Sequence, residues 1–202
     1  VTMLIAKLKG KHRDRLISEA LRDTDPDVLR KALSLVRKDA NGTIVARVRR
    51  LLTHEDEAVR EQAIQLLADQ PPKEAVSDLV GILDDPSDTV RWFAVESLRK
   101  LEAKSSVRKL YPLLSDTSDR VREIAALTLG ELGDADAVDV LVKALGDKNE
   151  RVRQQAAKAL QLIGVREPEA ARRIADELVK RKLYGPALQI LASLEESLAR
   201  DQ

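Results

Sequence analysis

The chain has 202 residues and contains no cysteine, one tryptophan, one phenylalanine and two tyrosines. The absence of cysteine excludes disulfide bonds and gives no sign of an oxidising compartment, so we expect a cytoplasmic protein. The only two histidines, His12 and His54, lie far apart in the sequence, so a zinc site is not expected. Eight glycines, seven prolines and 34% charged residues suit amphipathic helices with solvated outer faces.

An excess of charge of one sign is also lacking. The 35 basic and 34 acidic residues give a net charge of +1, which does not favour a nucleic-acid-binding protein. The balance is nevertheless uneven, because residues 1–50 carry +7, residues 51–150 carry −9 and residues 151–202 carry +3. No apolar run approaches the roughly 20 residues of a membrane-spanning helix. We therefore expect neither a membrane span nor a signal peptide.

What the sequence does contain is a repeat of 31 residues. The dipeptide Val-Arg recurs at this interval, as Val59-Arg60, Val90-Arg91, Val121-Arg122 and Val152-Arg153. One interval earlier the pair reads Val28-Leu29. Each pair is followed by an alanine and then by a large aliphatic residue: Ala32 and Val36, Ala63 and Leu67, Ala94 and Leu98, Ala125 and Leu129, Ala156 and Leu160. Spacings of three and four residues place these side chains on one face of a helix.

A second apolar stripe precedes each of these helices. Its members recur with the same period: Val45, Val48 and Leu52; Val76, Leu79 and Leu83; Val107, Leu110 and Leu114; Val138, Leu141 and Leu145. Polar turns such as "DDPSD" separate the two helices of a pair, and Gly133 is expected to stop a helix between pairs. Helices of about a dozen residues are not stable alone in water, so each pair must be covered by the next. The sequence therefore predicts an all-α protein, an α-solenoid of antiparallel helix pairs.

The repeats resemble HEAT repeats, specifically the short HEAT-like repeats of phycobilin lyase subunits and of many bacterial and archaeal scaffold proteins. The motif Asp-x4-Val-Arg-x2-Ala carries the resemblance, in "DPSDTVRWFA", "DTSDRVREIA" and "DKNERVRQQA". The resemblance covers essentially residues 12–163. It implies a right-handed superhelix in which the second helix of each pair lines the concave side.

We predict a single solenoid domain over residues 1–202. Residues 1–10 fit the second helix of a preceding repeat, which leads to the hypothesis that the chain is a piece of a longer protein. Five repeats are expected over residues 12–39, 43–70, 72–102, 104–133 and 135–164. Residues 167–202 are expected to form a capping helix pair that is partly polar, as the end of a solenoid should be.

The resemblance also implies a stacked polar ladder, in which an Asp of one repeat meets an Arg of a neighbour. The matching residues here are Asp23, Asp85, Asp116 and Asp147 with Arg60, Arg91, Arg122 and Arg153. His54 occupies one Asp position and Leu29 one Arg position, and we expect weaker coupling between repeats there. Charge-assisted hydrogen bonds of this kind would fix the stacking, so the ladder is expected to be architectural rather than catalytic.

Trp92 and Phe93 stand where other repeats have Glu61-Gln62, Glu123-Ile124 and Gln154-Gln155. Positions that accept Glu and Gln are not expected in the deep core. We therefore predict a partner-binding surface on the concave side, formed by Trp92, Phe93, Glu96, Arg99, Glu61, Glu123, Ile124 and Leu127. The alternative is that Trp92 or Phe93 packs between repeats and stabilises the fold.

No catalytic set emerges from the motifs. His54-Glu55 is similar to the His-Glu pairs of the HEAT-like deoxyhypusine hydroxylases, but the equivalent helix positions read Glu61-Gln62 and Gln154-Gln155, so the iron ligands are missing. HEAT-like DNA glycosylases place a tryptophan, an acid and many basic residues against phosphate. Trp92 lies instead in the acidic middle of the chain, where phosphate would be repelled. No Gly-rich phosphate loop or nucleophile elbow occurs.

The sequence therefore predicts a non-catalytic protein-interaction or scaffold module without metal or cofactor. We expect it to bind a protein partner rather than nucleic acid, and to be monomeric as a fragment. The alternatives are a nucleic-acid-binding protein similar to the HEAT-like DNA glycosylases, using basic clusters such as "KLKGKHRDR", and a phycobilin-lyase-like subunit.

Overall fold

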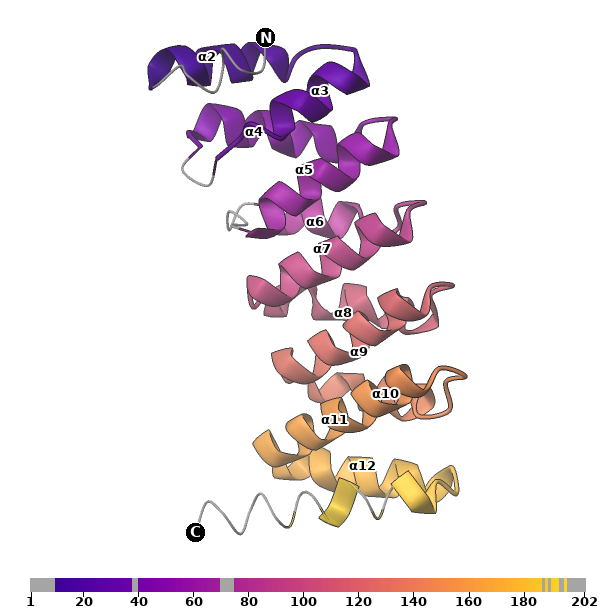
Figure 1. Ribbon diagram of the computed structural model, residues 1–202. Helices are drawn as coiled ribbons and strands as arrows, with labels where there is room; N and C mark the ends of the chain where they lie inside the picture. The colour runs from indigo at the N-terminus through magenta and orange to yellow at the C-terminus, as the bar shows by residue number, and fades with distance from the viewer. Residues whose placement is uncertain are drawn as a thin grey trace. The chain divides into compact units, whose positions relative to one another are not determined.

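Figure 1 shows the computed structural model of the chain. It describes residues 10–37, 40–69, 75–186, 188, 190–192 and 195, and every regular element among them is helical. The chain divides into two compact units, Val1–Leu101 and Glu102–Gln202. The helix expected within residues 1–9 and the polar residues expected after residue 195 lie outside the described residues.

Unit 1 contains three helix pairs among its described residues. Its elements are α2 (Lys11–Ala20), α3 (Pro26–Leu33), α4 (Gly42–Arg50) with the short 3-10 helix η1 (Leu51–Thr53), α5 (Glu57–Asp69), α6 (Val76–Gly81) and α7 (Asp88–Lys100). Side-chain oxygens cap the starts of three of these helices: Asp25 accepts the amide of Asp27, Asn41 that of Thr43, and Ser87 that of Val90.

Unit 2 continues the pattern. Its elements are η3 (Lys104–Ser106), α8 (Val107–Leu110), η4 (Tyr111–Ser115), α9 (Asp119–Leu132), η5 (Ala135–Ala137), α10 (Val138–Ala144), α11 (Glu150–Arg166) and α12 (Pro168–Lys180). Residues 184–186, 188, 190–192 and 195 are also helical. Pro112 is one reason why the first helix of this unit breaks into short segments, since proline cannot donate a backbone hydrogen bond.

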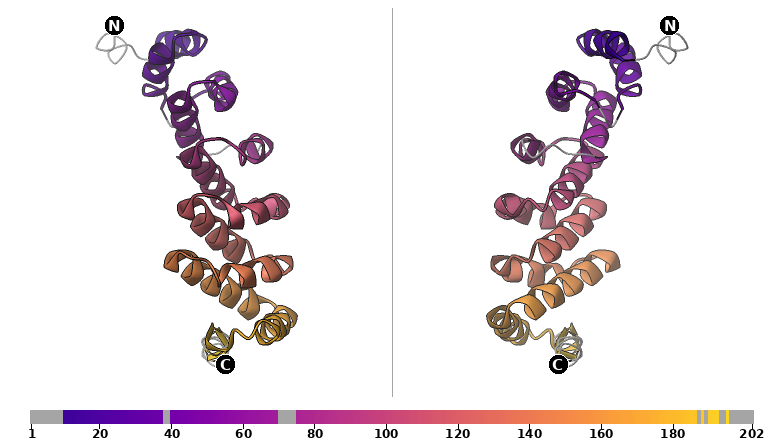
Figure 2. Two further views of the ribbon diagram at one scale, coloured as in Figure 1. Left: turned by 90° about the vertical axis from the view of Figure 1, so that its right-hand side faces the viewer. Right: turned by 90° about the vertical axis from the view of Figure 1, so that its left-hand side faces the viewer.

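Within each unit the helices form two layers (Figure 2). The second helices of successive pairs lie side by side, α3 with α5 and α5 with α7 in unit 1, and α9 with α11 in unit 2. The first helices, such as α4 and α10, pack on the second helices that follow them, α5 and α11. We call these the second-helix layer and the first-helix layer. The predicted α-solenoid of helix pairs is confirmed.

The repeated apolar residues fill the space between the layers. The valines that open the second helices, Val59, Val90, Val121 and Val152, are all 0% exposed. The alanines four residues later, Ala63, Ala94, Ala125 and Ala156, are equally buried. Burying a valine or leucine side chain stabilises a fold by about 1.5–3 kcal/mol, so the stripe supplies a large part of the stability of each unit.

Two glycines shape the contact between α9 and α11. Gly133 ends α9 in the left-handed conformation, with φ 71°, as the sequence predicts. Gly130 lies where the helices meet, because a Cβ atom there would be 2.5 Å from the Cα atom of Ala159. Arg166 at the end of α11 donates to the carbonyl oxygens of Gly130 (3.2 Å) and Glu131 (2.7 Å) and so satisfies the end of α9.

Candidate functional site

The ladder position of α5 links two neighbouring turns of unit 1. Arg60 donates from Nε to Oδ2 of Asp85 (2.8 Å) and from Nη2 to Oδ1 (3.0 Å). Its Nη1 donates to the carbonyl oxygens of His54 and Glu55, both at 2.9 Å. Both charged side chains are buried, at 9% and 6% exposure. The hydrogen bond to Asp85 raises the pKa of the Arg60 guanidinium, against the opposing effect of burial.

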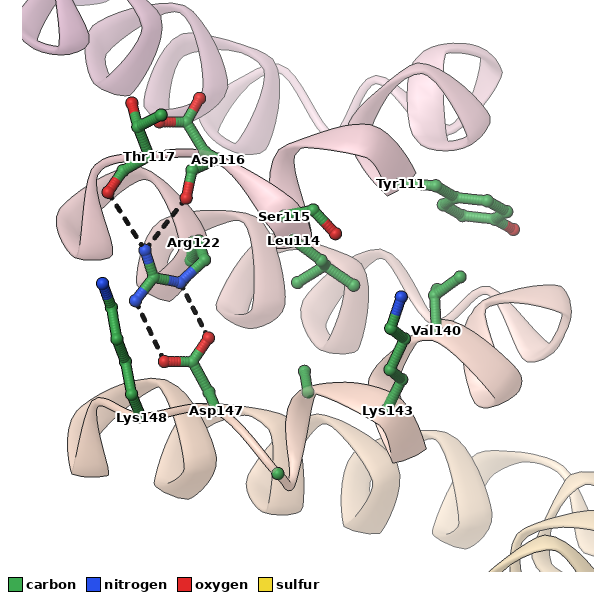
Figure 3. Close-up of a pocket in the computed structure, with 12 residues that line it drawn as sticks. Tyr111, Leu114, Ser115, Asp116, Thr117, Arg122, Val140, Lys143, Asp147 and Lys148 are labelled. Atoms are coloured by element: carbon green, nitrogen blue, oxygen red, sulfur yellow. Dashed lines mark hydrogen bonds and ion pairs between the residues drawn. The ribbon is translucent and has the colours of Figure 1, made fainter.

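Unit 2 repeats this arrangement 62 residues later (Figure 3). Arg122 donates to both carboxylate oxygens of Asp147, at 2.7 and 2.9 Å, and to the carbonyl oxygens of Asp116 and Thr117. The hydrogen bond from Arg122 lowers the pKa of Asp147, and the amide of Asn149 contributes in the same direction. A bidentate pair of this kind fixes the angle between two turns as well as their distance.

The other ladder residues hold their own turns. Arg91 donates from Nη1 to the carbonyl oxygens of Asp85 (2.6 Å) and Pro86 (3.2 Å). Arg153 does the same with Asp147 (2.8 Å) and Lys148 (3.1 Å). Each ladder aspartate also accepts the amide of the second residue after it, at distances of 2.8–3.0 Å: Asp23 from Asp25, Asp85 from Ser87, Asp116 from Ser118 and Asp147 from Asn149.

His54 replaces an aspartate without losing this turn bond. Its Nδ1 accepts the amide of Asp56 at 3.1 Å, the same bond that a carboxylate makes in the other turns. Leu29, at an arginine position, is 0% exposed and therefore belongs to the core. His54 thus keeps the hydrogen bond of its turn, and Leu29 keeps the packing of its helix. No ion pair can join the two positions, because leucine carries no charge.

The aromatic pair lies on α7 in the second-helix layer of unit 1. The ring centroids of Trp92 and Phe93 are 4.9 Å apart and the rings are nearly perpendicular, at 85°. An edge-to-face pair of this kind is favourable beyond its buried area. Both side chains are half-buried. They therefore belong neither to the deep core, where Val90 and Ala94 lie, nor to the open surface.

Two carboxylates accompany the aromatic pair within unit 1. Glu61 on α5 is half-buried and accepts the hydroxyl of Ser87, the residue that caps α7, at 3.3 Å. Glu96 on α7 accepts two hydrogen bonds from Arg99, at 2.7 and 2.9 Å. Gln62, the residue equivalent to Phe93, has a buried Oε1 atom without a hydrogen-bond partner among the described residues.

The three site residues predicted from unit 2 lie on α9. Glu123 and Leu127 are half-buried. Ile124 is only 6% exposed, which differs from the expectation that this position faces solvent. A β-branched aliphatic side chain gains free energy from burial at a position where glutamine, in Gln62 and Gln155, stays half-buried.

Unit 2 contains a pocket of about 480 Å³ beside the Arg122–Asp147 pair (Figure 3). Lys148 lies next to this pair, while Lys143 reaches toward Ser115 and Leu114 from the opposite wall. Tyr111, at the far end of the pocket, donates its hydroxyl to Asp134. Burial raises the pKa of the Tyr111 hydroxyl, and the hydrogen bond to Asp134 raises it further.

Sequence reasoning did not identify this pocket. A signal was present, because Lys143 and Lys148 stand where the preceding repeat has Pro112 and Thr117. The two ammonium groups are therefore particular to this repeat. The guanidinium of Arg122 already has four acceptors in the turns, whereas Lys143 and Lys148 have no ion-pair partner within the part of the chain that the structure describes.

The described residues contain no cluster of three or more His, Cys, Asp or Glu side chains that could hold a metal ion. Among the same residues, no helix combines the length and the apolar character that crossing a membrane requires.

The recurring Val-Arg helices and their ladder decide the family. The family model described as HEAT repeats matches three overlapping stretches, residues 13–99, 44–126 and 107–182. The chain belongs to the HEAT-repeat family. None of the curated proteins matches this HEAT-repeat chain.

Solved structures share the fold of this HEAT-repeat chain. A designed armadillo repeat protein is 21% identical, with a TM-score of 0.66 over 89% of this chain and 98% of that one. A second, in complex with the peptide (KR)4, is 21% identical, with a TM-score of 0.58 over 80% of this chain and 90% of that one. The complex of CpcE and CpcF of phycocyanin lyase from Nostoc sp. PCC7120 is 20% identical, with a TM-score of 0.50 over 93% of this chain and 83% of that one. Likeness at this level of identity concerns the fold alone.

Proposed function

We propose that this HEAT-repeat chain is a non-catalytic protein-binding module that acts as a scaffold, and that its partner binds the second-helix layer at Trp92 and Phe93. The observation that carries the proposal is the half-buried, edge-to-face aromatic pair on α7. It stands at positions where the preceding repeat has Glu61 and Gln62. Tryptophan is the residue most enriched among the anchors of protein interfaces.

The charge around the aromatic pair supports a basic partner segment. Glu61 lies in the same layer, and residues 51–150 carry a net charge of −9, whereas Glu96 is already paired with Arg99 and Lys100. A lysine or arginine of the partner would meet the face of Trp92 and the carboxylate of Glu61 together, a combination that favours cations. The designed armadillo relative in complex with the peptide (KR)4 offers a precedent for such a ligand on this fold.

The partner surface is centred on unit 1. Glu61, Trp92, Phe93, Glu96 and Arg99 contribute half-buried side chains to it. The proposed surface is confined to unit 1, although Glu123 and Leu127 on α9 of unit 2 are also half-buried, and Ile124 is buried.

The arrangement of buried charge supports a non-catalytic role. Arg60 and Arg122 are bonded to Asp85 and Asp147 in two copies of one pattern. Catalytic groups with perturbed pKa values are usually singular features of a cleft, whereas these recur with the repeat and satisfy one another. Their stabilising role is sufficient to account for them.

Isothermal titration with the (KR)4 peptide tests the proposal, with an acidic (DE)4 peptide as the ligand control. We expect the basic peptide to bind and Trp92→Ala to weaken it by about 2 kcal/mol, a factor of roughly 30. Leu16→Ala is the matched protein control, because Leu16 is a 40% exposed apolar residue of the same unit. Unchanged affinity in Trp92→Ala, together with a large fall in melting temperature, would show instead that Trp92 serves packing.

A further inference from the structure

The last helix pair of unit 2 exposes apolar side chains. α12 buries Ala170, Ile174 and Leu178, at 0–4% exposure, against α10 and α11. The helical residues after it bury Ile190 at 1% exposure. On the same segment Tyr184 is 57%, Leu188 69% and Leu191 39% exposed, as large apolar side chains rarely are.

These three residues form one stripe. Their spacing, i, i+4 and i+7, places Tyr184, Leu188 and Leu191 on a single face of the helix. A partly polar cap was predicted at this end, and the exposed Glu195 agrees with it. The described residues of this segment also offer an apolar stripe about two helical turns long. An apolar helix face of this kind marks an interaction site.

The two ends of the stripe carry opposite charge. The turn before Tyr184 is basic, with Lys180, Arg181 and Lys182 all exposed. Glu177 engages Lys180 (3.4 Å) and Arg181 (2.6 Å), whereas Lys182 has no ion-pair partner among the described residues. At the other end, one helical turn after Leu191, stands the exposed Glu195.

The turn itself is held firmly. The amide of Lys182 donates to the carbonyl oxygen of Val179, and the amide of Leu183 to that of Leu178, both at 2.9 Å. These two bonds are those of a Schellman motif at a helix end, in which the residue after the C-cap is normally a glycine in the left-handed conformation. Here that residue is Lys182, with φ 59°. The backbone of Lys182 is thus held in place at the start of the stripe.

We infer that the stripe binds the same stripe of a second copy of this chain, in an antiparallel two-fold dimer. A two-fold axis between Leu188 and Leu191 places Leu188 of one copy against Leu191 of the other. The same operation brings Glu195 of each copy to Tyr184 and Lys182 of its partner. The stripe is therefore self-complementary in the order of its apolar residues and in the charge at its two ends.

The charge pattern favours a second copy over the other occupants. An acidic partner helix or an anionic membrane surface would match the basic turn before Tyr184 but not Glu195 at the other end, whereas an antiparallel second copy matches both ends. Because the stripe is short compared with the 20–30 residues per side of a stable interface, we expect a weak, reversible dimer, with a dissociation constant on the order of 10 µM. This inference is independent of the proposed function, which concerns Trp92 in unit 1.

Sedimentation equilibrium from about 5 to about 500 µM protein measures the dimer directly. We expect the mass to rise reversibly from monomer to dimer, and the association to weaken with added salt. Leu188→Glu should abolish the dimer without changing the thermal melting curve, because Leu188 is exposed. Leu16→Glu, at an exposed leucine of unit 1, should leave the dimer intact.

A charge swap tests the register of the two copies. Lys182→Glu and Glu195→Lys should each weaken the dimer several-fold, and the double variant should restore it to within about two-fold of wild type. A monomer throughout the concentration range overturns the inference. A dimer indifferent to Leu188→Glu also overturns it, as does binding to anionic phosphatidylserine vesicles that Leu188→Glu abolishes while the chain stays monomeric.

Discussion

Arg122 and Asp147 lie 25 residues apart and are joined by two parallel hydrogen bonds of 2.7 and 2.9 Å. The two side chains are 5% and 11% exposed, so the pair connects neighbouring turns out of contact with most of the solvent. The same pair recurs as Arg60 and Asp85 in unit 1. This recurrence makes the ladder the clearest link between the sequence period and the packing of the repeats.

Removing one partner of this pair should destabilise unit 2 strongly. Arg122→Met leaves the Asp147 carboxylate buried and two turn carbonyls without their donor, so we expect a loss of about 3 kcal/mol. Replacing both, as Arg122→Met with Asp147→Leu, should cost less than the sum of the single changes. Urea denaturation measures both, with the exposed Arg151→Met as the control that changes stability by less than about 0.5 kcal/mol.

The same pair predicts a dependence of stability on pH. Because Arg122 lowers the pKa of Asp147 in the folded state, the carboxylate contributes stability that is fully present above its unfolded pKa of about 4. This contribution is lost as the pH falls through the lower, folded pKa. The stability difference between wild type and Asp147→Asn in urea denaturation should therefore shrink between about pH 5 and about pH 2. A difference that stays constant over this range would contradict the assignment.

Glu102 and Gly133 occupy equivalent positions, and both adopt positive φ, 49° and 71°. Only glycine takes this conformation without a steric penalty, so Glu102→Gly should stabilise the fold by up to about 1 kcal/mol. Gly133→Ala should do the opposite, since its Cβ would also meet Arg166 Nη1 at 2.9 Å. Thermal melting of the two variants, with opposite shifts, checks the prediction. Equal shifts in one direction would contradict it.

Gly130→Ala should weaken the contact between α9 and α11 by about 1–3 kcal/mol, because the new Cβ meets the backbone of Ala159. Ala159→Gly should not rescue it fully, since the Cα atom of residue 159 stays 2.5 Å away. Gly81→Ala is the matched control, with no atom within 4 Å of its added Cβ. Chemical denaturation distinguishes the three variants.

His54 supplies a turn bond that any good acceptor can supply. His54→Asp should leave stability at neutral pH within about 0.5 kcal/mol, because a carboxylate accepts the Asp56 amide as it does in the other turns. His54→Leu removes the acceptor and should cost about 1 kcal/mol. Denaturation of both variants decides the point, and equal losses would show that the Nδ1 bond contributes nothing.

The sequence was sufficient to predict the helix pairs, because their signal is periodic. Val59, Val90, Val121 and Val152 stand at the same position of the 31-residue repeat, and residues at equivalent positions of a repeat have similar surroundings, here the buried core. The irregular first helices were harder to predict. Local chemistry, such as Pro112 in η4, overrides the period there.

The candidate site was less predictable, because it depends on exceptions to the repeat. The polar residues equivalent to Trp92 correctly indicated a position outside the deep core, but the same reasoning placed Ile124 at the surface, where an apolar side chain instead became buried. Equivalent positions share a backbone environment, and each side chain then settles according to its own polarity and size. For the same reason, the exposed stripe around Leu188 could not be read from its apolar sequence.

Within each unit, successive second helices lie side by side in 31-residue phase, and the distance between two of them tests this stacking most directly. Since the chain has no native cysteine, spin labels can be attached at Asp27→Cys and Thr89→Cys alone, two repeats apart on α3 and α7. With helix axes 8–10 Å apart, double electron–electron resonance should give one narrow distribution centred at about 20 Å. A distribution centred beyond about 35 Å, or one without a defined maximum, would contradict the stacking of the repeats.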